Sequence, residues 1–173
     1  SRREGWKFAV ASFENPPPLH IAKLSEKYVG KPFFEGRTDR MSSEEKSDAM
    51  KWVSDHFLFL EQRGGESATI DSILDRAKQA VMRLGVRGLV IDPYNYIQQT
   101  KGVDNEHQGI NEMLTRLVTF ARAHDVHIWF IAHPAKMITN QDGTTPVPKG
   151  MNISGSAAFF AKADLGVTVH LDK

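Results

Sequence analysis

The feature that most constrains the fold is a run of large apolar residues that ends in a carboxylate and a proline. The run is Gly88-Leu89-Val90-Ile91-Asp92, and Pro93 follows directly. Continuous rather than alternating apolar residues are typical of a strand buried on both faces of a parallel sheet. Proline has no N–H to donate, so the hydrogen-bond ladder stops there. The run therefore predicts a central strand with Asp92 at its carboxyl end, where open α/β sheets bind ligands.

An aspartate in this position is also common as a helix cap or turn former, so its interpretation depends on the other strand ends. A predicted strand over residues 6–12 is followed by Glu14, and an apolar segment over residues 126–133 ends in His133. The carboxyl ends of parallel strands meet at one edge of a sheet, so these three side chains are expected to converge. An aspartate there can hold a magnesium ion through water while the ion neutralises nucleotide phosphates.

Strand and helix patterns alternate along the whole chain, which predicts a three-layer α/β fold. Ser42 and Glu45 have the spacing of a capping box, and Thr69 is a plausible N-cap for a helix that ends near Gly85. A polar loop is expected over residues 94–109, and a helix of small and aromatic residues over 154–163. The predicted strands cover residues 6–12, 57–60, 88–92, 126–133 and 165–171.

Length and composition restrict the class of protein further. The chain has 173 residues, enough for one domain with a sizeable core. Its net charge of +1 gives no global positive field, so contact with nucleic acid requires a local patch. Cysteine is absent and the histidines lack metal-ligand spacing, so neither disulfides nor a zinc site are predicted. No apolar run approaches the roughly 20 residues of a membrane span, and no membrane association is expected.

Four motifs follow one another along nearly the full chain. They are Ser12-Phe13-Glu14, Val90-Ile91-Asp92, Ile131-Ala132-His133-Pro134-Ala135-Lys136, and Ile153-Ser154-Gly155-Ser156-Ala157 followed by Ala163-Asp164. In their order and gaps they resemble the hexameric replicative DNA helicases with a RecA-like core. The His-Pro-x-Lys form is similar to the bacteriophage primase-helicase and Twinkle type within the DnaB superfamily, whereas DnaB proteins usually have glutamine at that position. The resemblance implies a RecA-like P-loop NTPase core with a mainly parallel sheet.

The resemblance also implies roles for individual residues. Glu14 matches the glutamate that orients and deprotonates the attacking water, Asp92 the Walker B aspartate of the magnesium site, and His133 the sensor of the γ-phosphate. The positions that match DNA-contacting residues are Lys136, Lys149, Gly155 and Ser156. The implied cofactors are ATP (or another NTP) and magnesium. The implied partners are single-stranded DNA, further copies in a hexameric or heptameric ring, and a linked or separate primase.

The sequence departs from that family in two respects. No G-x-x-x-x-G-K-[ST] loop occurs in it, so the phosphate cradle and its lysine are not found here. The family's arginine finger follows the strand predicted over residues 165–171. Residues 1–173 are therefore interpreted as a partial RecA-like helicase ATPase domain that starts after the P-loop, ends before the finger and is inactive alone. The expected location is the cytoplasm, for a bacterial or phage-encoded protein, rather than the mitochondrial matrix.

Three functions remain open on the sequence. The first is an ATP-driven motor that unwinds duplex DNA by translocating on a single strand. The second is a RecA-like recombinase or other hexameric ATPase, against which the His-Pro-x-Lys form argues. The third is a non-catalytic ring-assembly or DNA-binding module, which has no physical need for both Glu14 and Asp92.

Each site residue also has a simpler interpretation. Glu14 could be a surface acid, His133 could bond only to backbone, and the lysines could be solvated. Phe159 and Phe160 are predicted to be core residues rather than a base-stacking platform.

Overall fold

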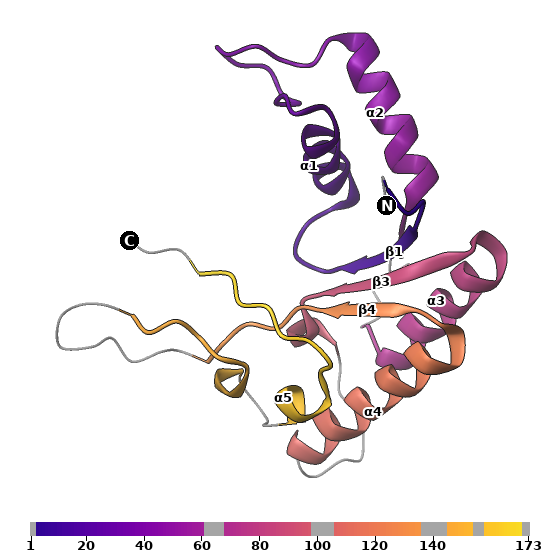
Figure 1. The fold of residues 1–173 in the computed structure, drawn as a ribbon, viewed down its shortest axis with the longest axis vertical. Helices are drawn as coiled ribbons and strands as arrows, with labels where there is room; N and C mark the ends of the chain where they lie inside the picture. Colours follow the sequence, from indigo (N-terminus) through magenta and orange to yellow (C-terminus); the bar gives the residue numbers. More distant parts are fainter. Residues whose placement is uncertain (1–2, 61–67, 98–105, 136–144, 154–157, 171–173) are drawn as a thin grey trace.

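The computed structural model describes residues 3–60, 68–97, 106–135, 145–153 and 158–170, and shows one sheet with helices packed around it (Figure 1). The strands are β1 (Lys7–Ser12), β2 (Phe57–Phe59), β3 (Val86–Asp92) and β4 (His127–Phe130). The helices are α1 (Pro17–Val29), α2 (Ser43–His56), α3 (Ile70–Leu84), α4 (Glu106–His124) and α5 (Ala158–Lys162), with short 3₁₀ turns η1 (Tyr94–Tyr96) and η2 (Gly150–Asn152). Among the described residues, no helix has the length and apolar character needed to cross a membrane.

The sheet is parallel throughout, with strand order β2-β1-β3-β4. The α/β class is therefore confirmed, and the predicted central strand β3 pairs with β1 on one side and β4 on the other. The strand expected over residues 126–133 is shorter in the structure, but Ile131 N still donates to Ile91 O at 2.9 Å. The strands that lead to Glu14, Asp92 and His133 are thus contiguous.

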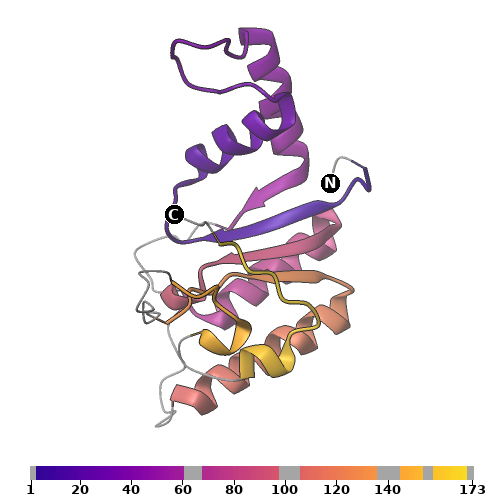
Figure 2. The same cartoon turned by 60° about the vertical axis from the view of Figure 1, so that its left-hand side comes forward.

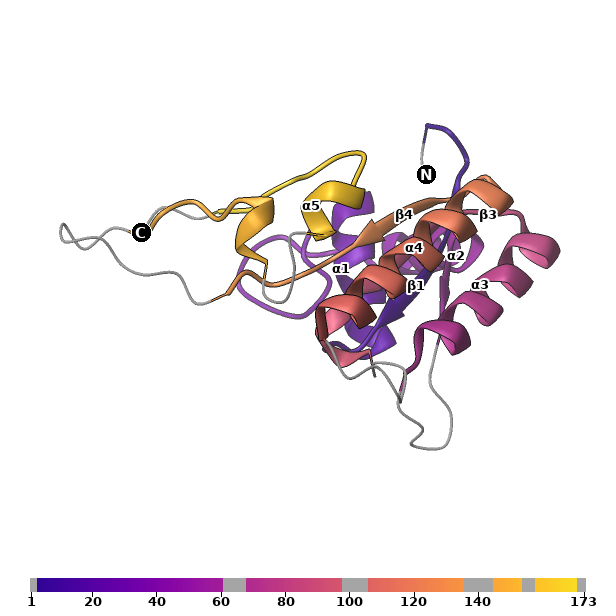
Figure 3. The ribbon, with the colours of Figure 1, turned by 90° about the horizontal axis from the view of Figure 1, so that it is seen from below.

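One face of the sheet carries the main hydrophobic core, under α3 and α4, which run side by side in Figure 3. Helix α3 begins at Thr69, whose hydroxyl accepts from Ser72 N at 3.2 Å, and ends at Gly85 in the left-handed region with φ 67°. These caps, both expected from the sequence, are confirmed. The residues of the two helices and the sheet that meet in this core include Ile70, Ile73, Ala77, Ile110, Leu114, Leu117, Ala9, Ala11, Leu89 and Ile91.

The opposite face is lined by aromatic rings and is covered near β1 and β2 by α2. Phe8 stacks on Phe57 with ring centroids 5.4 Å apart, and Trp52 of α2 meets Phe57 edge-on at 5.6 Å. Successive side chains of a strand point to opposite faces, so α2 lies across the sheet from α3. Helices α1 and α2 pack against each other and project beyond β1, as Figures 1 and 2 show. The expected layered architecture is therefore present.

Gly88 has aromatic rings from both neighbouring strands above its backbone. A Cβ at this position would lie 2.4 Å from Phe8 Cδ1 and 2.9 Å from Trp129 Cζ3. Those distances are shorter than any relaxed carbon–carbon contact, so the close packing of β1, β3 and β4 on this face requires glycine.

The predicted last strand, residues 165–171, is wrong for the part that the structure describes. Residues 165–170 are extended without strand pairing, and Leu165, Val167 and Val169 are 80%, 90% and 94% exposed. A strand is stable only when a neighbour satisfies its N–H and C=O groups. The segment is instead joined to the preceding loop at Pro148, whose carbonyl oxygen accepts from the Thr168 hydroxyl at 3.1 Å.

Two further expectations are corrected. The loop predicted over residues 94–109 contains η1, with Tyr94 and Ile97 buried, and α4 already begins at Glu106. Of the two phenylalanines predicted to be core residues, only Phe159 is buried, because Phe160 lies on the outer side of a short helix and is 67% exposed.

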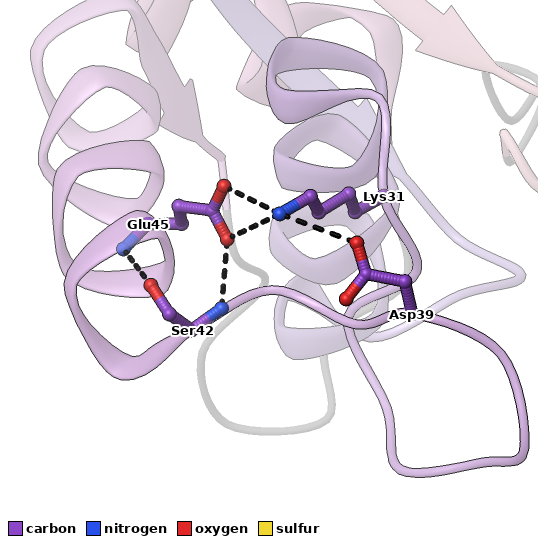
Figure 4. A network of polar contacts seen from close by, with 4 residues as sticks. All are labelled: Lys31, Asp39, Ser42 and Glu45. Carbon is purple, nitrogen blue, oxygen red and sulfur yellow. Dashed lines mark hydrogen bonds and ion pairs between the residues drawn. The ribbon is translucent and has the colours of Figure 1, made fainter.

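The chain turns between α1 and α2 through a loop in which Lys31 contacts two carboxylates (Figure 4). Lys31 Nζ lies 2.8 Å from one carboxylate oxygen of Glu45 and 3.5 Å from Asp39. Glu45 also completes the predicted capping box, accepting from Ser42 N at 2.8 Å, while Ser42 Oγ accepts from Glu45 N at 3.1 Å. The hydrogen bond from Lys31 holds the pKa of Glu45 below its usual value, and the same bond raises the pKa of Lys31.

We expect this network to make the stability of the α1–α2 pair depend on pH. Because the pKa of Glu45 is lower in the folded state, its contribution is complete above the unfolded value of about 4.5 and is lost as pH falls through the folded pKa. Glu45→Gln keeps the cap acceptor but removes the ionic bond, so it should lower the melting temperature at pH 7 and have a diminishing effect on acidification.

Glu44→Gln is the matched control, because Glu44 is an exposed acid in the same helical turn. Melting curves followed by circular dichroism between about pH 2.5 and 8, a range that spans the titration of a carboxyl group, measure both variants. Equal pH profiles for Glu45→Gln and Glu44→Gln would contradict the assignment.

Candidate functional site

The carboxyl ends of β1, β3 and β4 form one edge of the sheet, and the predicted site residues come from this edge. Glu14 lies in the turn between β1 and α1, and Asp92 is the last residue of β3. Phe13 N donates to Asp92 O at 2.9 Å, and Tyr94 N donates to Ile131 O at 3.0 Å. These two bonds tie together the chain segments that leave all three strands.

The structure brings Glu14 and His133 into contact across 119 residues of sequence. Glu14 Oε1 lies 3.3 Å from His133 Nε2, and the two side chains are 39% and 55% exposed. The contact leaves both groups open to solvent, so a phosphate and an attacking water have access to them. A carboxylate bonded to an imidazole at an exposed sheet edge is an arrangement suited to general-base chemistry.

Asp92 is the last residue of β3, the strand between the two that lead to Glu14 and His133. Its partner in the β1–β3 register is Ser12, and its side chain is partly exposed. Within the described ranges, no three His, Asp or Glu side chains gather closely enough to hold a metal ion. A single carboxylate fits Mg²⁺, which usually keeps several waters and takes its remaining ligands from substrate phosphates.

Of the four predicted DNA-contacting positions, the structure describes one. Lys149 is exposed at the start of η2, and its N–H donates to Asn152 Oδ1 at 2.8 Å. Asn152 O in turn accepts from Ala135 N at 2.7 Å. The turn formed by Lys149 and η2, called the Lys149 turn below, is thus attached to the chain just past His133. The other three positions, Lys136, Gly155 and Ser156, lie outside the described residues.

The sequence did not indicate that a second histidine lies beside this edge. His20, in the first turns of α1, has its Nε2 2.8 Å from Ser12 Oγ, and its ring stacks on Phe59. A cavity of about 430 Å³ lies next to this contact, lined by Ser12, Phe13, Glu14, Asn15 and Phe59 among others. The only signal in the sequence was that His20 follows Glu14 closely. That spacing indicates proximity only once α1 is known to begin at Pro17, so that His20 lies in its first turn.

The chain is similar to known proteins along most of its length. No protein-family model matches the chain. The chain is 44% identical to the Twinkle homolog protein, chloroplastic/mitochondrial, of Arabidopsis thaliana. The alignment has 174 positions and covers 98% of the chain. Along almost its whole length the chain is therefore similar to a Twinkle homolog, which agrees with the form of the motif around His133.

Solved structures support the same fold at much lower identity. The chain matches a solved ATPase domain with a TM-score of 0.68 at 18% identity, and the match covers 92% of this chain and 57% of that one. It matches a DnaB-like replicative helicase, studied with its primase interactions, with a TM-score of 0.71 at 18% identity, covering 92% and 40%. The RecA-like fold is therefore confirmed.

The chain spans about a quarter of the Arabidopsis protein, 24% of its length. The activity, substrates and partners of a whole helicase are accordingly matters for proposal. The expected bacterial or phage origin stays a prediction, because the name of the relative refers to chloroplasts and mitochondria.

Proposed function

We propose that this chain is part of the motor of a replicative DNA helicase that hydrolyses ATP and translocates on single-stranded DNA to unwind the duplex. The observation that carries the proposal is the contact between Glu14 and His133 at 3.3 Å, just past the ends of the two strands that flank β3, which ends at Asp92. The 44% identity to a Twinkle homolog supports the same function. The proposal includes ATP and magnesium as cofactors, a ring of six or seven copies, and a primase in the same protein or in a partner.

In this proposal the residues at the three strand ends have different roles in ATP hydrolysis. Glu14 orients the attacking water and accepts its proton, and Asp92 holds the magnesium ion through water. Magnesium, when bound, neutralises charge on the phosphate oxygens. His133, which bonds to Glu14, provides a link between the state of the phosphate and the chain that follows β4. That chain is attached to the Lys149 turn, so a shift of His133 has a direct mechanical path to a DNA-contacting residue.

Glu14→Gln is expected to separate hydrolysis from binding in the complete helicase that carries this segment. Loss of the general base should reduce the rate of ATP hydrolysis by about 10²–10⁴-fold, while nucleotide affinity stays within a few fold. Asp92→Asn should instead weaken the magnesium-dependent part of nucleotide binding. Steady-state hydrolysis and titration of a fluorescent nucleotide with and without magnesium measure the two effects.

A matched control is Glu44→Gln, which removes an exposed carboxylate on α2 far along the chain from the strand ends. It should leave hydrolysis and binding unchanged. Normal hydrolysis by the Glu14→Gln protein would remove the central assignment of the proposal.

Residues 1–173 alone are expected to show no measurable affinity for ATP and no hydrolysis. The site edge supplies carboxylates, which repel a polyphosphate, and the sequence contains no Gly-rich loop with the backbone N–H groups and lysine that would bind it. Isothermal titration calorimetry with ATP and magnesium tests this directly. Micromolar affinity for ATP would contradict this prediction. It would mean that residues to which the proposal gives no phosphate-binding role bind the phosphates.

DNA binding by the ring is expected to depend on Lys149 in a salt-sensitive way. Each phosphate contact contributes about 0.7 to the slope of log affinity against log salt for single strands. Lys149→Ala in every subunit should therefore lower both the affinity and the slope, and the effect should be larger for the ring than for a single subunit because the contacts act together.

Fluorescence anisotropy of a labelled oligonucleotide at several salt concentrations measures both quantities. Lys78→Ala, which removes an exposed lysine of α3, is the control and should change neither. An unchanged salt slope for Lys149→Ala would exclude a phosphate contact at this position.

A further inference from the structure

The turn that carries Glu14 receives little packing support from one side. It covers the few residues between the end of β1 at Ser12 and the start of α1 at Pro17. The cavity of about 430 Å³ lies directly against it, lined by Ser12 to Pro17 and, from the β2 side, by Phe59 and Leu60. Buried side chains fix a backbone by filling the space around it, and here that space is open. The position of Glu14 therefore depends on the bonds at the two ends of the turn, on the stacking of Phe13 on Tyr96, and on its own contact with His133.

At the β3 side the turn is fixed by backbone. Ser12 pairs with Asp92 in the parallel register, and Phe13 N donates to Asp92 O at 2.9 Å. This bond fixes where the turn begins along the strand direction, level with Asp92. It does not fix the direction in which the chain leaves β1, because the next residues have no strand partner.

At the α1 side the turn is fixed by a single side-chain bond, between His20 Nε2 and Ser12 Oγ at 2.8 Å. The bond spans eight residues and closes a loop with Glu14 inside it. The imidazole is itself held, because it stacks on Phe59 at the end of β2 with centroids 5.7 Å apart and planes 29° from parallel. Both residues are half-buried, so the bond is partly shielded from competing water.

We propose that Ser12 and His20 are a positioning pair that fixes the turn carrying Glu14 relative to Asp92. The inference rests on the proposed function, because it assigns a role in the same site. Neither residue needs to touch nucleotide. Their bond keeps the Glu14 carboxylate at the distance from Asp92 and His133 that the reaction requires, and a displacement of about 1 Å can reduce such a reaction by about 100-fold.

The kinetic test uses the complete helicase and measures kcat and KM for ATP separately. Ser12→Ala and His20→Ala should each lower kcat by about 10–100-fold with KM within about twofold, as for the loss of a supporting contact behind a reacting group. Because the two side chains form one bond, the double variant should be no slower than the slower single variant. His20→Gln retains a side-chain group that can donate to or accept from the Ser12 hydroxyl, and it should recover most of the rate.

Lys23→Ala, at an exposed position of α1, is the control and should leave both constants unchanged. If kcat is unchanged in both alanine variants, or if their effects multiply in the double variant, the positioning pair is excluded. A rise in KM at constant kcat would assign His20 to nucleotide binding and would also overturn the proposal.

A second readout does not depend on hydrolysis. In ¹⁵N-labelled protein the His20 Nε2 resonance reports the hydrogen bond to Ser12, and Ser12→Ala should shift it while Lys23→Ala should not. An unchanged resonance in Ser12→Ala would show that the bond is absent. The two proposals fail differently: if Glu14→Gln leaves hydrolysis intact the proposed function is wrong, whereas if it abolishes hydrolysis and His20→Ala does not, only the positioning pair is wrong.

Discussion

The parallel pairing of β1 with β3 is the constraint on which the rest of this structure depends. Six register pairs join the two strands, the last of them between Ser12 and Asp92. Side chains of paired residues in neighbouring parallel strands stand on the same face, with the strands about 4.8 Å apart. A one-residue change of register would move Glu14 along the edge and turn every side chain of the shifted strand to the other face. Pairing of the backbone thus determines the distance between the candidate base and the candidate metal ligand.

The contacts around the site differ in how strongly they are supported. Asp92 ends a strand that pairs on both sides, whereas Glu14 lies in a turn beside a cavity, and His133 lies three residues beyond the end of β4. Regions with few buried apolar contacts open at low free-energy cost. The candidate metal ligand is thus on the rigid part of the edge, while the residues proposed to handle water and phosphate are on its more adaptable parts. Under the proposed function, this division would keep the ion in place while the groups around the phosphate rearrange.

Much of the fold followed from local chemistry in the sequence. The capping boxes at Ser42 and Thr69 and the glycine at position 85 were predictable because each depends on residues within one turn of the chain. The ends of β1 and β3 were predictable because continuous apolar runs are typical of strands that pair on both sides, whereas β4 lies at the edge of the described sheet. The strand expected over residues 165–171 failed for the opposite reason, since strand formation requires a partner that sequence pattern alone does not supply. The bond between His20 and Ser12 was equally out of reach, because it depends on how α1 leaves the sheet.

Gly88 has a consequence for how the strands are held in line. Phe8 and Trp129 close over its bare backbone from β1 and β4, with ring centroids 5.4 Å apart. Every neighbouring position of β3 carries a side chain, so sliding this strand by a pair of residues would drive a valine into the space that the rings occupy. The two rings occupy the space that a side chain at position 88 would need, and this contact lies toward the opposite end of the strands from the site. The alignment of Glu14, Asp92 and His133 is thereby locked at a distance from the chemistry, by a residue that has no side chain at all.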